Sequence, residues 1–411
     1  MYRFKGLFLV FLIMTGLQLI GAVPVLVTSS GVAQPGRQTF PIPGSPTSSA
    51  LTSAVQAASS IEEVLSFEKY VPLEETSDSF LKEVSLAIGM GGFWFVLDIW
   101  EGKVYQYGEG GSFVRVIGRP GQGPGEYRRP VNMIRCPEGL AIVDTAKILV
   151  FNVNGNLIRT LDKNASTGVV FQSHAVIWPE PNRIYLFSNP LHKPNAPWHA
   201  ILEQNQDREW MVAGGFGQRP LKIQRAGDKG GWSWIYSCAA LVGDHIWCGS
   251  PYDCSLEVYD LQGNLVGRPN GLHPNGLKSS ELTADILQDP REVSRLMTRR
   301  ITNKNLLPHE TLVFRILSNP INAVSYDIYD THGRVLKKGL HPGKGGLQLM
   351  DSSNGVLSGV KTLLNGLPPN KLDWRLFFTR AEFENAKNAG LQLDTDQGRH
   401  FLWVGRLKHP S

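Results

Sequence analysis

The chain has 411 residues, with 41 Lys and Arg against 36 Asp and Glu, and a net charge of +5. Only 19% of the residues are charged, and the basic ones are scattered instead of gathered in one stripe, which argues against a nucleic-acid-binding protein. The 43 glycines, 10 tryptophans and 11 tyrosines favour many short strands joined by tight turns over a helical bundle.

The amino terminus has the pattern of an export signal. Arg3 and Lys5 precede an uncharged run, and a small-x-small cleavage site ends at Ala33. The apolar run has about 21 residues, enough to cross a bilayer as a helix. Residues 1–33 are therefore expected to be either a cleaved signal peptide or an uncleaved signal anchor. In both cases the protein is secreted, periplasmic or attached to the cell envelope, and an uncleaved anchor would be its only membrane contact.

A spacer is predicted after the signal. Residues 34–60 are rich in Pro, Ser, Thr and Ala, with almost no charged or aromatic side chains. Such a segment cannot bury enough apolar surface to order itself, so we expect it to be disordered. The folded domain is then expected over residues 61–411.

The stretch 117–160 contains one complete loop-and-strand unit. Its glycine- and proline-rich run, 118–125, cannot lie inside a helix or a central strand and is expected to be a loop. Four short apolar runs separated by turns follow, and the Asn154–Gly155 pair predicts a type I′ hairpin. The expected strands are Met133–Ile134, Leu140–Val143, Ile148–Val153 and Leu157–Leu161.

A loop followed by a four-stranded meander is one blade of a β-propeller. The run from Gly118 to Tyr127 resembles the G-x-x-G-x-G-P-G-E-[YF] loop that closes the first blade of NHL-like propellers in secreted bacterial proteins. This resemblance implies an all-β, six-bladed propeller of the NHL/TolB-like type.

Further copies of the hairpin support a repeat of about 45 to 70 residues. The five turns are expected at Gly110, Gly155, Asp207, Gly263 and Gly333. The sixth blade must come from both ends of the chain, with residues 347–365 and 399–407 joined by Leu65–Pro72. Closure avoids long unpaired strand edges. A seventh blade is the alternative.

The four cysteines do not form a zinc motif, because no C-x-x-C pair is present. A hairpin turning at Gly243 would place Cys238 nearly opposite Cys248, so a disulfide is expected among Cys238, Cys248 and Cys254. A Cys248–Cys254 bridge and buried free thiols are the alternatives.

Two pairs of residues are candidate ligand contacts. Asp98 and Asp144 each follow a strand, where the resemblance implies either a cap on the adjoining turn or a polar or cation ligand in the central channel. Trp232 and Trp234 alternate about Ser233, so in a strand both indoles would share one face. There they would either stack on a sugar or peptide or pack between blades.

These observations predict a monomeric, non-enzymatic binding module for a protein, peptide or glycan ligand. No G-x-S-x-G elbow is present and the ten histidines are isolated, so no catalytic residue is assigned. No cofactor is expected. The alternative is a metal-dependent hydrolase or lyase with Ca²⁺ or Zn²⁺ in the central channel, as found in some NHL-type propellers.

Overall fold

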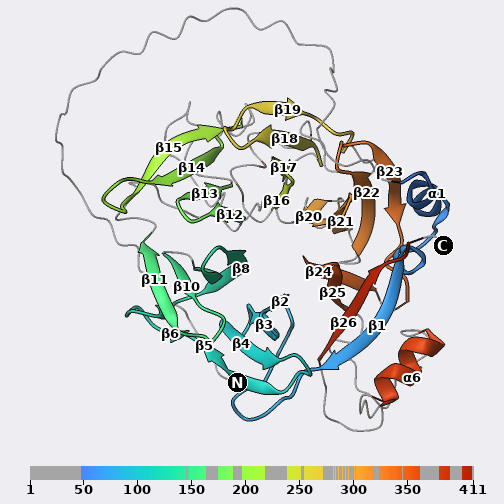
Figure 1. Cartoon of the computed structure of the whole chain (residues 1–411), viewed down its shortest axis with the longest axis horizontal. Helices are drawn as coiled ribbons and strands as arrows, with labels where there is room; N and C mark the ends of the chain where they lie inside the picture. The colour runs from blue at the N-terminus through green and yellow to red at the C-terminus, as the bar shows by residue number, and fades with distance from the viewer. Residues whose placement is uncertain are drawn as a thin grey trace, which may run out of the picture. The chain divides into compact units, whose positions relative to one another are not determined.

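The computed structural model (Figure 1) divides the chain into two units, Met1–Gln38 and Thr39–Ser411. The predicted signal, residues 1–33, lies outside the described residues. The structure describes residues 48–144, 147–162, 175–187, 197–217, 238–250, 254–271, 302–318, 324–344, 346–361, 379–388 and 400–409, with single residues between 281 and 300.

Six four-stranded antiparallel sheets form the blades of the second unit. Blade 1 comprises β2 (Leu86–Met90), β3 (Phe93–Asp98), β4 (Lys103–Gly108) and β5 (Phe113–Ile117). Blade 2 comprises β8 (Pro130–Cys136), β9 (Gly139–Asp144), β10 (Lys147–Phe151) and β11 (Leu157–Asp162). Blade 3 comprises β12 (Val176–Glu180), β13 (Arg183–Leu186), β14 (His199–Gln204) and β15 (Trp210–Phe216).

Blade 4 comprises β16 (Cys238–Val242), β17 (His245–Gly249), β18 (Leu256–Asp260) and β19 (Leu265–Gly267). Blade 5 comprises β20 (Thr302–His309), β21 (Leu312–Ser318), β22 (Val324–Asp330) and β23 (Val335–Leu340). Blade 6 comprises β24 (Leu347–Ser353), β25 (Val356–Lys361), β26 (Phe401–Leu407) and β1 (Leu65–Pro72). A small parallel pair, β6 (Arg119–Pro120) with β7 (Glu126–Tyr127), closes the glycine loop between blades 1 and 2.

The blades close into a ring. The first strand of each blade is innermost and lies beside that of the next blade, and β24 lies beside β2 (Figure 1). Blade 6 is built from both ends of the chain, because β1 pairs with β26 from Leu65 opposite Leu407 to Pro72 opposite Phe401. The predicted six blades and their closure in a shared blade are therefore confirmed.

The innermost strands run in the same direction. Near their starts, Lys304 Nζ of β20 donates a hydrogen bond to Gln348 Oε1 of β24 at 2.7 Å. Near their ends, the Arg135 guanidinium of β8 binds the carboxylate of Asp351 in β24 and the carbonyl of Gly89 in β2. We call the end of the ring where the innermost strands begin the top face, and the other end the bottom face.

Five hairpins on the bottom face share one turn, at 108–112, 152–156, 205–209, 260–264 and 330–334. In each, the fourth residue donates its backbone N–H to the first carbonyl and has a positive φ. Asn154 is not among the positive-φ residues, whereas Gly155 has φ +76°. The predicted type I′ turn is therefore wrong: one left-handed residue, followed by a register shift, makes a bulged turn instead.

The polar residue that opens four of these turns explains why the turn recurs. Asp260 Oδ1, for example, accepts backbone N–H bonds from Gln262 at 2.9 Å and Asn264 at 2.8 Å. Asn152, Asn205 and Asp330 accept equivalent bonds in their own blades. A side chain that binds its own turn in this way specifies the hairpin locally.

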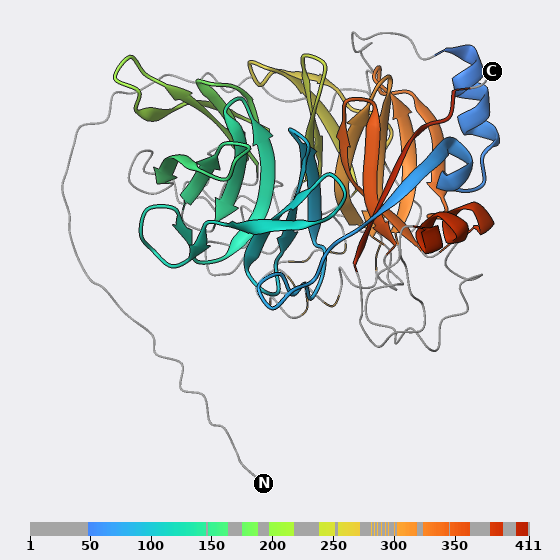
Figure 2. The ribbon, with the colours of Figure 1, turned by 60° about the horizontal axis from the view of Figure 1, so that its bottom comes forward.

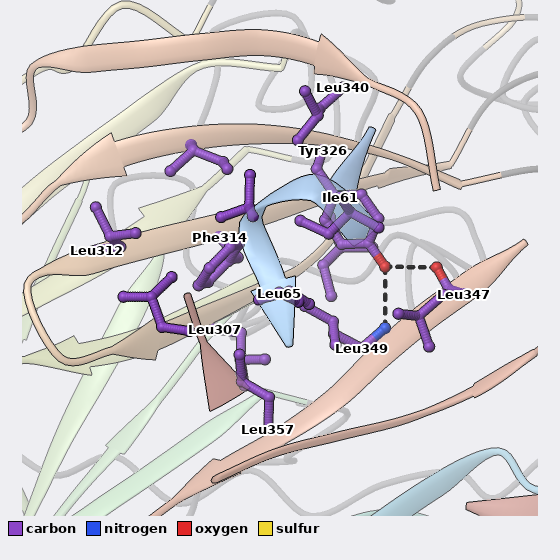
Figure 3. Packing of buried hydrophobic residues seen from close by; sticks show 14 of the residues in the cluster. Ile61, Leu65, Leu307, Leu312, Phe314, Tyr326, Leu340, Leu347, Leu349 and Leu357 are labelled. Carbon is purple, nitrogen blue, oxygen red and sulfur yellow. Dashed lines mark hydrogen bonds between the residues drawn. The ribbon is translucent and has the colours of Figure 1, made fainter. Parts of the chain in front are cut away.

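The largest hydrophobic cluster lies between blades 5 and 6 (Figure 3). Leu307 and Phe314 of blade 5 belong to it, together with Leu349 of blade 6. Tyr326 ties the two blades together, since its hydroxyl donates to the carbonyl of Leu347 at 2.7 Å and accepts from the amide of Leu349 at 3.0 Å. Burial accounts for the apolar composition of these strands.

Three helices lie outside the ring among the described residues: α1 (Ser49–Ala57), α2 (Ile61–Val64) and α6 (Arg380–Asn388). Helix α1 packs on β23 and α6 on β1, at the outer edges of blades 5 and 6 (Figure 2). Leu51 and Val55, four residues apart, are buried on one side of α1. Ordered structure therefore begins within the predicted spacer, because these two side chains bury apolar surface that the polar composition of the segment did not predict.

All four cysteines are free thiols, so the expected disulfide is wrong. In the hairpin of β16 and β17, Cys238 pairs with Gly249, and Cys248 with Ala239. This one-residue offset directs the two thiols to opposite faces of the sheet. Cys238 belongs to the core shared with blade 5 and Cys248 to the core shared with blade 3. Burial raises the pKa of the Cys238 thiol to about 12.

Candidate ligand-binding site on the top face

Asp98, at the top end of β3, fixes two loops of blade 1. It is fully buried. Its Oδ2 accepts the backbone N–H groups of Lys82 at 2.7 Å and Glu83 at 3.2 Å, and its Oδ1 accepts those of Trp100 at 2.9 Å and Glu101 at 3.0 Å. These bonds are those of a turn cap. Asp98 thereby holds the loop that carries Glu83 against the turn that carries Trp100.

Trp100 is the most exposed large apolar side chain that the structure describes, with 73% of its surface accessible. Its indole Nε1 donates a hydrogen bond to Glu83 Oε2 at 2.5 Å. One edge of the ring is therefore fixed while its apolar faces remain in solvent. Tryptophan has this combination where it serves as a stacking platform.

Lys304 lies near the start of β20, on the same face. Its side chain is accessible, yet surrounding protein desolvates the ammonium group and lowers the pKa of Lys304, an effect that the charge of Glu83 opposes. Glu83 thus interacts with Trp100 in blade 1 and with Lys304 in blade 5. With Gln348, which accepts the hydrogen bond from Lys304, these residues form the top-face cluster: Glu83, Trp100, Lys304 and Gln348.

Charged side chains surround the cluster, and two of its neighbouring lysines share one carboxylate. Lys82 forms an ion pair with Glu101 at 2.5 Å, and Lys103 lies 3.9 Å from the same carboxylate. The Lys82 ammonium accordingly lowers the pKa of Glu101. With Lys304, Glu83 and the buried Asp98 included, three lysines face three carboxylates, and Lys304 is the lysine that contacts none of them.

Asp144 occupies the corresponding position in blade 2, at the top end of β9, and is also fully buried. Its Oδ1 accepts the backbone N–H of Arg129 at 2.7 Å, in the segment that leads into β8. The two aspartates therefore play similar parts in neighbouring blades. Direct contact of Asp98 or Asp144 with a ligand stays a prediction.

Trp232 and Trp234 lie outside the described residues, and their predicted role is untested. The connection that contains them leaves β15 at Gly217 and enters β16 at Cys238, and both of these residues lie at the top ends of their strands. The structure therefore brings Asp98 and Asp144 to the top face, together with the described ends of this connection.

Sequence reasoning missed all four members of the top-face cluster. Trp100 carried a usable signal, because it lies two residues after an aspartate that follows a strand, where an Asx turn exposes the next side chains. Lys304 and Gln348 carried none, because their proximity depends on β20 and β24 being neighbouring innermost strands.

The described parts of the chain contain no group of three His, Cys, Asp or Glu side chains arranged to hold a metal ion. Histidine is buried in a different setting: His199 lies among Phe187, Phe216 and Tyr259, with its Nε2 3.4 Å from Cys248 Sγ. Burial lowers the pKa of His199 to about 3 and raises that of the Cys248 thiol, so both are neutral at pH 7. This pair is packed as core.

Within the ranges given above, no helix is both long and apolar enough to span a membrane.

Known proteins share this architecture. Residues 51–196 match the DUF5128 family, described as a 6-bladed beta-propeller. A protein of Bacteroides fragilis NCTC 9343 described as exported has a similar structure, with a TM-score of 0.62 and 15% identity over 85% of this chain and 97% of that chain. A DUF4221 member from Bacteroides vulgatus ATCC 8482 has a TM-score of 0.54 and 10% identity, over 84% and 98%. No curated protein matches the sequence. The structural likenesses concern the fold.

Proposed function

We propose that the chain is an exported, non-enzymatic propeller that binds a protein, peptide or glycan ligand on its top face. The observation that carries this proposal is Trp100, whose ring is largely exposed while its indole N–H is anchored to Glu83. Leaving an indole in water is unfavourable, and anchoring it adds an entropic cost. A ligand that covers the ring would offset both.

Export is supported by the sequence pattern of residues 1–33 and by the resemblance of residues 118–127 to the blade-closing loop of secreted NHL-like propellers. A structural neighbour is itself described as exported. Determining the amino-terminal residue of the protein isolated from its host would test this part. A start at Gln34 is expected from a cleaved signal, whereas intact residues 1–33 in a soluble cytoplasmic fraction would contradict export.

Binding is tested with Trp100→Ala. The purified domain, immobilised on a sensor, is exposed to a panel of neutral and acidic oligosaccharides and to a peptide library displayed on phage. We expect Trp100→Ala to lower the affinity for the captured ligand about tenfold, since loss of one stacking contact costs about 1 kcal/mol or more.

The matched control is Met211→Ala, which removes another exposed apolar side chain, 51% accessible, from β15 in blade 3. This variant should bind like the parent protein. Equal binding by the parent protein and Trp100→Ala would show that the top face is not the ligand site.

A further inference from the structure

Three features of the top-face cluster restrict the chemistry of its ligand. The first is the geometry of Trp100. Because Nε1 at the edge of the indole is bonded to Glu83, a ligand has access to the flat faces of the ring. Sugar rings present flat C–H faces that suit such a platform, whereas an extended peptide needs a strand edge or a groove.

The second feature is the incomplete pairing of Lys304. Its ammonium group donates to the neutral amide oxygen of Gln348, and no ion pair joins it to a carboxylate in the part of the chain that the structure describes. The side chain is accessible at the surface, but nearby protein partly desolvates the ammonium group and lowers the pKa of Lys304. A partly desolvated cation without a contacting anion is unfavourable, and a ligand carboxylate would stabilise it.

The third feature is the set of hydrogen-bonding groups beside the platform. Within the described residues no hydrogen bond reaches Glu83 Oε1, which can accept from a hydroxyl, and the amide nitrogen of Gln348 can donate to one. With the Lys304 ammonium, which contacts no carboxylate among the described residues, this arrangement matches a ring with several hydroxyls and one negative charge.

We propose that the top-face cluster binds a uronic acid unit of an acidic glycan, with the sugar ring stacked on Trp100 and its carboxylate paired with Lys304. The inference rests on the proposed binding function and narrows its ligand class. Glu83 and Gln348 then bind ring hydroxyls, and Asp98 positions Glu83 and Trp100 without touching the sugar.

Isothermal titration calorimetry on the purified domain tests the ligand class. The acidic probes are trimers of galacturonate and of mannuronate, and the matched neutral probes are trimers of galactose and of mannose. We expect at least one acidic trimer to bind ten or more times tighter than its neutral counterpart. We also expect this preference to shrink as salt is raised, because salt screens the accessible ion pair.

Two variants separate the contributions of the ring and the charge. Trp100→Ala should lower the affinity for the acidic trimer about tenfold and should still bind the acidic trimer more tightly than the neutral one. Lys304→Met should remove the preference and leave the affinity for the neutral trimer unchanged. The remote variant Met211→Ala should behave like the parent protein.

The outcomes distinguish failure of this inference from failure of the proposed function. Equal binding of acidic and neutral trimers, or an unchanged preference in Lys304→Met, overturns the uronate assignment while top-face binding stands. Binding of oligoglutamate in place of every sugar probe also overturns it, in favour of an acidic peptide. If none of the trimers binds, the uronate assignment fails, and the peptide library and Trp100→Ala decide separately on the proposed function.

Discussion

The bottom-face turns all contain one residue with a left-handed backbone conformation, but the residue type at this position differs between blades. Blade 3 uses Arg208 at φ +64° as the left-handed residue, whereas the other four turns use a glycine: Gly111, Gly155, Gly263 and Gly333. Only glycine adopts this region without strain, because other residues bring Cβ close to the carbonyl oxygen. The turn of blade 3 is therefore the strained copy.

Replacing Arg208 with glycine should stabilise the protein. The strain relieved slightly exceeds the entropy cost of a glycine, so we expect a gain of about 0.5–1 kcal/mol in the free energy of unfolding. Gly155→Ala is the matched opposite change. A Cβ there would lie 2.7 Å from Ile117 Cδ1, so a loss of about 1–3 kcal/mol is expected. Urea denaturation measures both, and destabilisation by Arg208→Gly would contradict the argument.

His199 should make the protein sensitive to acid. Its pKa is about 3 in the folded protein and 6.5 in an ordinary setting. Between these pH values His199 is therefore protonated in the unfolded chain and neutral in the folded protein. Stability present above pH 6.5 is therefore lost as the pH falls toward 3, by up to about 1.4 kcal/mol per pH unit.

Carboxylates also affect stability in this range, so the comparison must be made with His199→Gln. The stability of the parent protein should fall more steeply with decreasing pH than that of the variant. Denaturation midpoints at pH 7, 5.5 and 4.5 measure the two slopes. Parallel curves would rule out His199 as the source.

At the scale of elements, local sequence patterns predicted individual strands well, but they did not predict which strands and helices pack beside one another. The run 147–162 contains its own turn residue and apolar alternation, so β10 and β11 were predictable. The innermost strand β20 was not recognised as the start of a blade, and the apolar pair of α1 was overlooked in a polar composition. The top-face cluster depends on such neighbours, which explains why it was missed.

A buried ion cluster connects strand β25 of blade 6 to the helices α2 and α6. Lys361, at the end of β25, has a fully buried ammonium group that contacts Glu62 of α2 at 2.8 Å and Glu382 of α6 at 3.1 Å. Its third bond is to the carbonyl of Lys344 at 2.6 Å. Glu382 also accepts the indole N–H of Trp403 in β26, at 3.1 Å. The cluster therefore fixes both terminal segments to the last blade.

Lys361→Met should be strongly destabilising. It leaves two carboxylates close together and short of a counterion, and removing one partner of a buried ion pair costs about 3–5 kcal/mol. Arg406→Met is the control, since it breaks the exposed pair with Glu68 on the same blade and should cost less than about 1 kcal/mol. Chemical denaturation at pH 7 compares them, and similar losses in the two variants would show that the buried cluster does not hold the blade.

The whole molecule has a ring that both ends of the chain complete. Arg135 adds a second link at the bottom face, since it joins blade 2 to Asp351 of blade 6 and to Gly89 of blade 1. Closure itself was predictable, because five visible hairpins left one blade to be supplied by the termini. The Arg135–Asp351 pair was not, because 216 residues separate its partners.

Removing the last strand should destroy the cooperativity of the fold. Deletion of residues 401–411 takes away β26, which pairs with β1 on one side and with β25 on the other. Strand β1 would then lose its place in the sheet, and β25 would present an unpaired edge. Because every blade packs on two others, we expect the single thermal transition of the full chain to broaden or vanish in calorimetry.

Deletion of residues 1–47 is the control, since it leaves α1 and β1 in place and should retain the parent melting temperature. A protein without residues 401–411 that still melted in one sharp transition at that temperature would show that the ring does not depend on closure by its termini.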